Sequence, residues 1–290
     1  MNLLITGATG FLGSHLTRAF LGEGHRVVAL KRATSSLIRL AEVADKVAFY
    51  DLEGLDLQAT VSREAPIDAV IHTATCYGRR GESAVEVFEA NTTFPLRLLA
   101  AAGRHGVGVF LNADTVLPRD VNAYALSKFQ FVEWGKRLSQ DQHIRFVNLR
   151  LEHLYGPGDD ASKFTTWIVK SCLANVPEIK LTAGEQQRDF IHIADAVSAF
   201  KVILEHVFAF NPGFTELGIG TGEPVSVRNF VEVTHRLCRS RSNLAFGALP
   251  YRENELMECG TNLRSLLSWG WRSQIPLEVG VAEMLREMMR

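Results

Sequence analysis

The 290-residue sequence predicts an α/β protein built on a doubly wound parallel sheet, with a smaller C-terminal lobe. Three observations support this prediction. A short apolar run at the N-terminus leads directly into a glycine-rich turn. Strand-like runs then alternate with longer amphipathic stretches through the first half, as parallel strands joined by helices require. After Gly156-Pro157-Gly158 the alternation loosens into short elements, which indicates a second lobe.

The N-terminal run and its turn form the strongest local pattern. Residues 2–6 are strand-like, Gly7, Gly10 and Gly13 follow, and residues 14–21 have helical periodicity. In such a turn the first glycine permits the tight bend, the second lets the backbone approach a pyrophosphate, and the third lets helix and strand pack closely. Residues 26–30 supply the next strand at the spacing of a βαβ unit. The sequence therefore predicts a Rossmann-type dinucleotide-binding unit; the alternative is a glycine turn without a ligand.

The end of the second strand indicates which cofactor binds. An acidic residue there would accept a hydrogen bond from a ribose 2′-hydroxyl and repel a 2′-phosphate, but this chain has Lys31 and Arg32. A guanidinium binds phosphate through two parallel hydrogen bonds, and the hydroxyls of residues 34–36 lie beside it in the sequence. The sequence thus favours NADP(H) over NAD(H), with solvated loop charges as the alternative.

Four more strand-like runs complete the predicted sheet, at residues 46–50, 68–72, 107–111 and 145–149. Ligands of doubly wound sheets bind beyond the carboxyl ends of the strands. Asp51, His72 and residues 112–115 fall at those ends, so we expect them to converge with the glycine turn on one crevice.

Tyr124 and Lys128 form a candidate proton-transfer pair. Four residues separate them, so on a helix both side chains emerge from one face about one turn apart. A nearby ammonium is expected to lower the pKa of the phenol, which is about 10 in a free tyrosine, and to make it usable for proton transfer. Because a tyrosine and a lysine at this spacing also occur by chance on many helices, the pair indicates a catalytic site only together with the predicted dinucleotide-binding turn.

Composition narrows the class of protein. The net charge of −1 gives no general attraction to nucleic acid or to an anionic membrane surface. The four cysteines are far apart, and no histidine spacing suits a metal, so neither a metal site nor a disulfide framework is expected. No apolar run reaches membrane-spanning length and the first strand begins at once, so we expect a cytoplasmic protein without a signal peptide.

Taken together, these patterns resemble the extended short-chain dehydrogenase/reductase family of nucleotide-sugar epimerases, dehydratases and ketoreductases. The resemblance rests on Gly7-x-x-Gly10-x-x-Gly13, Asp51-Leu52, Val70-Ile71-His72-Thr73-Ala74, Asn91 before a helix, Tyr124-x-x-x-Lys128, Leu149-Arg150, Tyr155-Gly156-Pro157-Gly158 and Arg188-Asp189-Phe190-Ile191-His192. Within the family, residues 149–160 followed by Ser162-Lys163-Phe164 look most like the CDP-abequose and CDP-paratose synthases, which reduce a 4-keto group on a CDP-linked deoxysugar.

The resemblance implies a role for each matching position. Tyr124 would protonate the oxygen of a substrate ketone, and Lys128 would lower the Tyr124 pKa and hold the nicotinamide ribose. Arg188 and Arg252 would bind the nucleotide diphosphate. The expected cofactor contacts are Gly7, Thr9, Gly10, Phe11, Leu12, Lys31, Arg32, Asp51, Leu52, Thr73 and Lys128, with Asp51 beside the adenine.

Two positions depart from the family pattern. Ala113 stands where a serine or threonine hydroxyl is usual, so Thr115, two residues further along an extended segment, becomes the candidate for polarising the carbonyl. Asp114 is a candidate substrate contact and could instead assist as an acid. His153 stands where relatives have an asparagine that contacts the sugar; it is a candidate substrate ligand or a structural histidine.

The favoured function is NADPH-dependent reduction of the 4-keto group of a CDP- or dTDP-linked 4-keto-6-deoxy or 3,6-dideoxy sugar. The alternatives are a nucleotide-sugar epimerase or dehydratase that retains NAD, and a non-catalytic NADPH-binding protein. Residues 1–155 are expected to bind the cofactor, and residues 156–290 mainly the substrate, interleaved with the last sheet strands. The amphipathic helices expected at residues 85–104 and 124–138 suit a homodimer interface or packing on the sheet.

Overall fold

The computed structural model describes residues 1–289 and divides them into two compact units. Unit 1 contains residues 1–150 and 200–217, and unit 2 contains residues 151–199 and 218–289. The chain passes between the units three times, within strand β6 (Arg145–Leu151), helix α7 (Ile193–His206) and strand β11 (Gly213–Ile219). The functional domains predicted at residues 1–155 and 156–290 stay a prediction.

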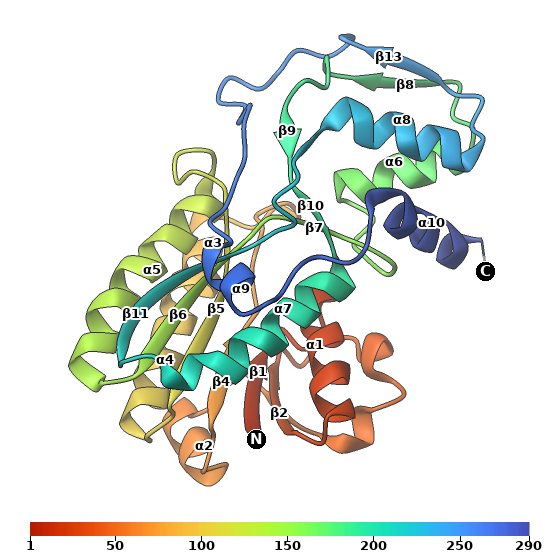
Figure 1. Ribbon diagram of the computed structural model, residues 1–290. Coiled ribbons are helices and arrows are strands. Elements are labelled where there is room, and N and C mark those ends of the chain that lie inside the picture. Colours follow the sequence, from red (N-terminus) through yellow and green to blue (C-terminus); the bar gives the residue numbers. More distant parts are fainter. Residues whose placement is uncertain (290) are drawn as a thin grey trace. The chain divides into compact units, whose positions relative to one another are not determined.

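Unit 1 is built on a seven-stranded sheet with the order β11-β6-β5-β4-β1-β2-β3 (Figure 1). Its other strands are β1 (Asn2–Thr6), β2 (Arg26–Lys31), β3 (Val47–Asp51), β4 (Ala69–His72) and β5 (Val109–Thr115). The pairs β1–β2, β2–β3, β1–β4 and β4–β5 are parallel. The chain builds outward from β1 to β3 and then crosses to β4 on the other side of β1. This reversal confirms the predicted doubly wound α/β fold and opens a crevice at the carboxyl ends of β1 and β4.

Most strands coincide with the predicted runs, but β5 continues four residues beyond its predicted end at residue 111. The extension contains Asn112, which is fully buried although it is polar. Its side-chain amide donates a hydrogen bond to Asn148 on β6, with 2.7 Å between Nδ2 and Oδ1. Because this bond compensates for burial, the polar residues continue the strand and place Asp114 and Thr115 at its end.

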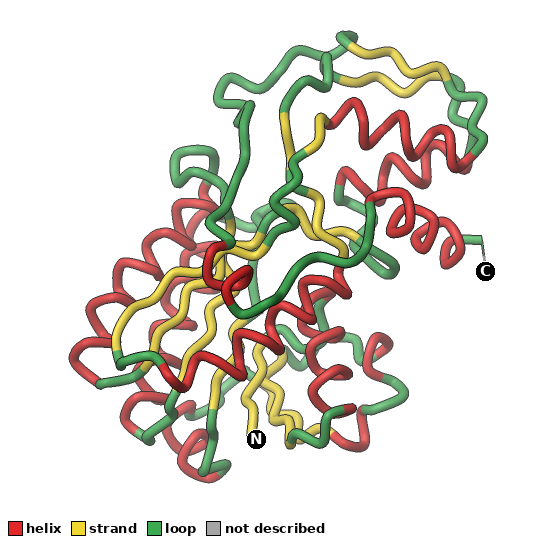
Figure 2. The backbone as a smooth tube through the Cα atoms, in the orientation of Figure 1, coloured by secondary structure: helices red, strands yellow, loops and turns green. Residues whose placement is uncertain are grey.

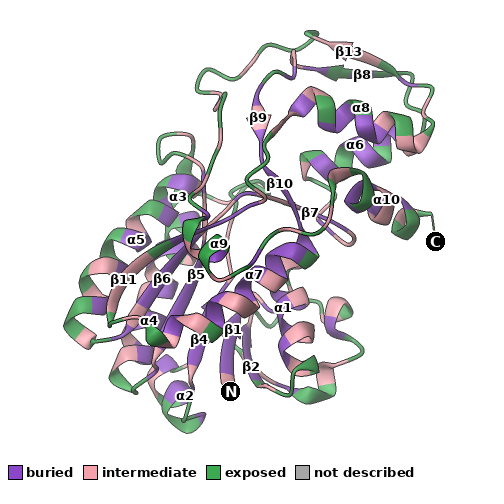
Figure 3. Cartoon of the chain, viewed as in Figure 1, coloured by how far each residue is buried: buried purple, intermediate pink, exposed green. Residues whose placement is uncertain are grey.

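Helices cover the two faces of this sheet. On one face, α2 (Leu57–Arg63), α4 (Phe94–Arg104) and α5 (Ala123–Gln142) bury apolar side chains against β1, β2, β4, β5 and β6. On the other face, α1 (Phe11–Gly22) contacts β1 and β2. The last residues of α7 are tied to the end of α1 by an ion pair of 2.6 Å between Lys201 and Glu23. The strands are consequently buried along most of their length (Figure 3).

The helix predicted at residues 85–104 is present, but it contains a π turn that the sequence did not indicate. A short helix α3 (Ala84–Phe88) begins with a capping box at Ser83 and Glu86, passes into a single π-helical turn over Glu89–Thr93, and only then continues as α4. A π turn inserts one extra residue into the helical register. It contains Asn91, which is fully buried and hydrogen-bonded to the Cys76 backbone.

Unit 2 contains short strands paired in twos rather than one sheet (Figure 2). β7 (His153–Tyr155) pairs with β10 (Phe190–His192), β9 (Gln187–Arg188) with β12 (Val225–Ser226), and β8 (Glu178–Leu181) with β13 (Asn243–Phe246). Its core lies among α6 (Phe164–Leu173), α8 (Val227–Cys238) and α10 (Leu277–Met288), and a short α9 spans Arg264–Ser268. Within residues 1–289, no helix combines the length and the apolarity that crossing a bilayer requires.

Candidate functional site

The glycine turn of unit 1 leaves no room for side chains. Gly7 has φ +70°, and a Cβ there would lie 2.6 Å from the backbone nitrogen of Ala74. A Cβ on Gly13 would lie 2.1 Å from the Gly7 carbonyl oxygen and 2.8 Å from the Thr73 hydroxyl. Gly10 begins α1 without a side-chain cap, so the first amides of the helix remain available to an anion. This cradle between β1, α1 and the end of β4 fits a dinucleotide pyrophosphate.

The predicted cofactor-selecting residues lie at the ends of β2 and β3. Lys31 is opposite Asp51 in the strand register, and the two side chains form an ion pair. The Leu52 amide donates to the Lys31 carbonyl at 2.8 Å, which holds the two strand ends together. Arg32 is exposed, and within residues 1–289 its guanidinium makes no hydrogen bond or ion pair. Of the two cations, Arg32 is therefore the one with an uncommitted charge.

Tyr124 and Thr115 are brought together at the start of α5. Asn122 caps the helix by accepting a hydrogen bond from the Ala125 amide at 2.9 Å, which places Tyr124 in the first turn. The Thr115 hydroxyl lies close enough to the phenol to lower its pKa, and the ring of Tyr77 lies 5.0 Å from that of Tyr124. The two hydroxyl groups are therefore neighbours at the start of α5, and the role predicted for Thr115 stays a prediction.

The expected lowering of the Tyr124 pKa is wrong for this structure. Burial, Tyr77 and Asp114 raise the pKa of the phenol, and the nearby Thr115 hydroxyl only partly opposes them. Lys128 is buried and donates to the Ala113 carbonyl at 2.7 Å, so its ammonium is held by β5 rather than by the phenol. Burial also lowers the pKa of Lys128. Tyr124 therefore keeps its proton at neutral pH, which is the form a proton donor needs.

His72 belongs to the core under this site. It is fully buried among the rings of Phe94, Phe110 and Phe131, and its Nδ1 lies 2.7 Å from the Thr6 hydroxyl. Burial, with a smaller effect of Lys128, holds the pKa of His72 well below its usual range. A neutral imidazole enclosed in this way packs the end of β4, and its side chain is not exposed to the crevice that the sequence predicted at the strand ends.

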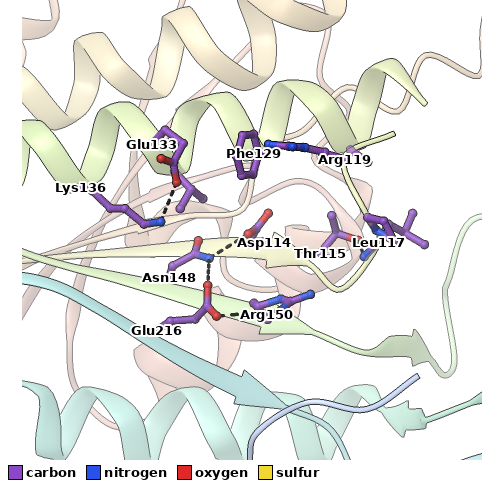
Figure 4. Close-up of a pocket in the computed structure, with 13 residues that line it drawn as sticks. Asp114, Thr115, Leu117, Arg119, Phe129, Glu133, Lys136, Asn148, Arg150 and Glu216 are labelled. Carbon is purple, nitrogen blue, oxygen red and sulfur yellow. Dashed lines mark hydrogen bonds and ion pairs between the residues drawn. The ribbon is translucent and has the colours of Figure 1, made fainter. Parts of the chain in front are cut away.

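A cavity of about 300 Å³ opens beside Thr115, between α5 and the ends of β5, β6 and β11 (Figure 4). Asn148 on β6 donates to Asp114 at 2.8 Å and to Glu216 at 3.3 Å, so one amide holds two carboxylates. Arg150 lies 3.9 Å from Glu216 and donates to the Val116 carbonyl at 3.2 Å. Asp114 is thus oriented by β6 and lies close enough to Tyr124 to raise its pKa.

In unit 2, Arg188 is buried and fully engaged. It donates to Glu255 at 2.6 Å and to the carbonyls of Gln187 and Leu256. Arg252 is exposed, yet its charge lies close enough to lower the pKa of Arg188, after the larger effect of burial. Two guanidinium groups and one carboxylate therefore share a small region, so a dianionic ligand would have to compete with Glu255 for Arg188.

His153 lies on β7 beside a buried acid. Its backbone amide donates to the Asp189 carbonyl at 2.9 Å, and its ring meets the edge of Phe190 at 6.0 Å. The Asp189 carboxylate is buried and accepts from the Thr221 amide and hydroxyl and the Gly222 amide at 2.7–2.9 Å. Asp189 therefore fixes a turn, while His153 keeps a partly exposed ring.

Several residues that shape these sites were missed in the sequence. Asn91 ties Cys76 to the Ser127 hydroxyl at the start of α5, and Asn148 joins Asp114 to Glu216. Glu152 is buried beside His153. Of these residues, only Asn91 could have been found in the sequence, as one of the positions that carry the family resemblance. The contacts of Asn148 and Glu152 depend on neighbouring strands, which no spacing in the sequence reveals.

Comparison with known proteins identifies the family. The sequence profile of the NAD dependent epimerase/dehydratase family matches residues 3–214. CDP-abequose synthase of Salmonella typhimurium is 33% identical, over 99% of this chain and 98% of its own length. A dTDP-4-dehydro-6-deoxy-D-allose reductase of a Streptomyces species is 30% identical over 78% of this chain and 77% of its own. Among solved structures, MoeE5 in complex with UDP-glucuronic acid and NAD superposes with a TM-score of 0.85 at 25% identity, covering 100% of this chain and 99% of MoeE5.

The family match covers most of the chain, and the similarity to CDP-abequose synthase extends over nearly its whole length. The chain therefore belongs to the NAD dependent epimerase/dehydratase family and is an NAD(P)-dependent oxidoreductase of the extended short-chain dehydrogenase/reductase type.

Proposed function

We propose that this enzyme uses NADPH to reduce the 4-keto group of a CDP- or dTDP-linked 4-keto-6-deoxy or 3,6-dideoxy sugar. The observation that carries the proposal is the placement of the Tyr124 phenol beside the Thr115 hydroxyl, on the same helix as the buried Lys128 one turn further on. The similarity to a CDP-abequose synthase over nearly the whole chain, and to a dTDP-4-dehydro-6-deoxy-D-allose reductase, supports this substrate class.

The bound nicotinamide supplies the hydride that the carbonyl carbon accepts. Tyr124 donates its phenolic proton to the carbonyl oxygen, and its raised pKa keeps that proton in place until the oxygen gains charge. Thr115 donates a hydrogen bond to the same oxygen in place of the hydroxyl that Ala113 lacks. Lys128, held by the Ala113 carbonyl, stabilises the phenolate left after proton transfer.

The preference for NADPH depends on Arg32. Its uncommitted guanidinium at the end of β2 suits a 2′-phosphate, whereas the charge of Lys31 is already balanced by Asp51. The Lys31–Asp51 pair then borders the adenosine site, and Thr9, Phe11 and Leu12 face the pyrophosphate with the three glycines. Within the proposal, unit 1 binds the cofactor and unit 2 supplies Arg188 and Arg252 for the diphosphate and His153 for the sugar.

We also propose a cytoplasmic homodimer. Large apolar side chains are exposed on α3 and α5, among them Phe88 at 43% and Trp134 at 57%. Adjacent helices with such faces suit a helical interface between two copies. Sedimentation should give a dimer at micromolar protein, and a strict monomer would refute this part of the proposal.

The test follows oxidation of the reduced nicotinamide by absorbance, with NADPH or NADH and a CDP- or dTDP-linked 4-keto-6-deoxy sugar. We expect one NADPH consumed per sugar reduced, and a loss of about 100-fold or more in kcat for Tyr124→Phe, since a positioned acid contributes on that order. Tyr50→Phe is the matched control, because that hydroxyl is bonded to Glu64 outside the site.

The other possible results of this assay support one of the alternative functions or refute a residue assignment. Conversion of the sugar without net NADPH oxidation would establish the epimerase alternative with retained NAD. Binding of NADPH without conversion of any sugar would establish the non-catalytic alternative, and full activity of Tyr124→Phe would refute the assignment of the proton donor.

A further inference from the structure

Within residues 1–289, no group donates a hydrogen bond to the buried carboxyl group of Glu152. This residue follows the last residue of β6, its side chain is 0% exposed, and neither carboxylate oxygen has a hydrogen-bond partner within residues 1–289. A buried ionised carboxylate is strongly destabilising unless it is paired and hydrogen-bonded. A protein that keeps such a destabilising group does so because the group contributes to a functional site, not to the stability of the fold.

The neighbouring groups of unit 2 do not compensate for this burial. Arg188 directs its donors to Glu255 and to two backbone carbonyls, and none to Glu152. Asp189 is saturated by the turn at Thr221. Burial, reinforced by Glu152, raises the pKa of Cys259 to about 11, and the Cys259 sulfur accepts from the Asp189 amide. Gly220 leaves space for the acid, because a Cβ there would lie 2.9 Å from the Glu152 Cγ.

Arg188 lies close enough for Glu152 to raise its pKa, but it donates no hydrogen bond to Glu152, and His153 is a neighbour whose ring nitrogen is still unpartnered. Its Nδ1 lies 3.6 Å from the Glu152 Oε2, and this nitrogen is also buried without a hydrogen-bond partner. The ring is held from a second side by Phe190, at 6.0 Å and 64°, and Phe190 is itself stacked on Phe230 at 4.4 Å. A small ring shift would join the two unpartnered groups in one hydrogen bond, and with the carboxyl group ionised only a proton on Nδ1 satisfies both.

We propose that Glu152 is a positioning residue that fixes His153 in the Nδ1–H tautomer, so that Nε2 accepts a hydrogen bond from a sugar hydroxyl of the substrate. A carboxylate that sets the tautomer of an imidazole in this way is a general device for orienting histidine. With 31% of its side chain exposed, His153 retains access to a ligand, whereas Glu152 has none. The assignment of a sugar hydroxyl as the ligand rests on the proposed function; the tautomer does not.

The first measurement is independent of turnover. Nitrogen-15 NMR of the His153 imidazole in the free protein, at a pH where the ring is neutral, should show the proton on Nδ1. Glu152→Met removes the acceptor and should abolish that preference, whereas Glu152→Gln, which keeps a carbonyl acceptor, should partly restore it. Because replacing a buried charge with an apolar side chain of similar volume is often neutral or stabilising, Glu152→Met should not unfold more easily than the wild type.

The second measurement compares CDP-glucose with CDP by calorimetry. Glu152→Met should weaken binding of CDP-glucose about tenfold, the equivalent of one hydrogen bond, and leave that of CDP within about twofold. Glu253→Gln, a change at an exposed glutamate of the same unit, should alter neither.

An Nε2–H tautomer in the wild type, or equal losses of CDP and CDP-glucose in Glu152→Met, would overturn the proposal. If the wild type binds neither CDP-glucose nor dTDP-glucose, the proposed function fails instead, and the NMR result still decides the role of Glu152.

Discussion

Replacing Gly13 with alanine tests the dinucleotide cradle most directly. The new Cβ would lie 2.1 Å from the Gly7 carbonyl oxygen, a backbone atom of a turn that is itself packed on Ala74. Reaching an ordinary contact requires α1 and the turn to separate by roughly 1 Å, and overpacking of this kind destabilises proteins by about 1–3 kcal/mol. We expect the upper end of that range, because neither side of the contact is a flexible side chain.

Gly22→Ala is the matched control on the same helix. Gly22 is exposed at the end of α1, and a Cβ there meets nothing within 4 Å. The same glycine-to-alanine change should therefore stabilise the protein by about 0.5–1 kcal/mol through helix propensity. The two alanine variants should differ by about 3.5–4 kcal/mol in unfolding free energy, in opposite directions from the wild type.

Urea unfolding followed by circular dichroism measures the stabilities, and fluorescence titration measures NADPH binding. Gly13→Ala should bind NADPH at least tenfold more weakly, because the displaced helix terminus no longer meets the pyrophosphate, whereas Gly22→Ala should bind normally. The reasoning would be refuted if Gly13→Ala unfolded at the wild-type urea concentration and bound NADPH within twofold of it.

Two further predictions concern charges of unit 1. Arg32→Ala should raise the Kd for NADPH about tenfold and leave that for NADH within twofold, because its guanidinium is the uncommitted cation; equal effects in titrations of both cofactors would contradict this assignment. The Tyr50 hydrogen bond and, to a smaller extent, Arg26 lower the pKa of Glu64 from its ordinary value of 4.5. This stabilisation is present above pH 4.5 and is lost as the pH falls through the lowered pKa, so Glu64→Gln should reduce Tm at neutral pH and match the wild type in strong acid.

The sequence was sufficient for the features that depend on local spacing. The strand over residues 2–6, the glycine turn and the helix that carries Tyr124 and Lys128 follow from periodicity and from the backbone freedom of glycine, and each occurs as predicted. Ala113 and Thr115 lie two residues apart on β5, as the expectation for Thr115 required, and its role stays a prediction.

The features that depend on neighbouring strands could not be predicted. The β2–β3 register places Asp51 opposite Lys31 and pairs the two charges, which no spacing in the sequence indicated. The sequence led us to expect Lys128 to lower the Tyr124 pKa, but burial and Asp114 outweigh that effect. The polar stretch beginning at Asn112 continued as strand only because Asn148 on β6 supplies its partner. In each case the decisive group is distant in the chain.

The three passages of the chain between the units have a consequence for any attempt to divide or exchange them. No single cut releases unit 1, because β11 returns from residues beyond 200 to cover β6. A fragment that ends at residue 150 would leave β6 as an uncovered edge strand, a template for aggregation. A second unit taken from a relative must therefore join at three points, within β6, α7 and β11, so this unit can change in sequence much more freely than it can be exchanged whole.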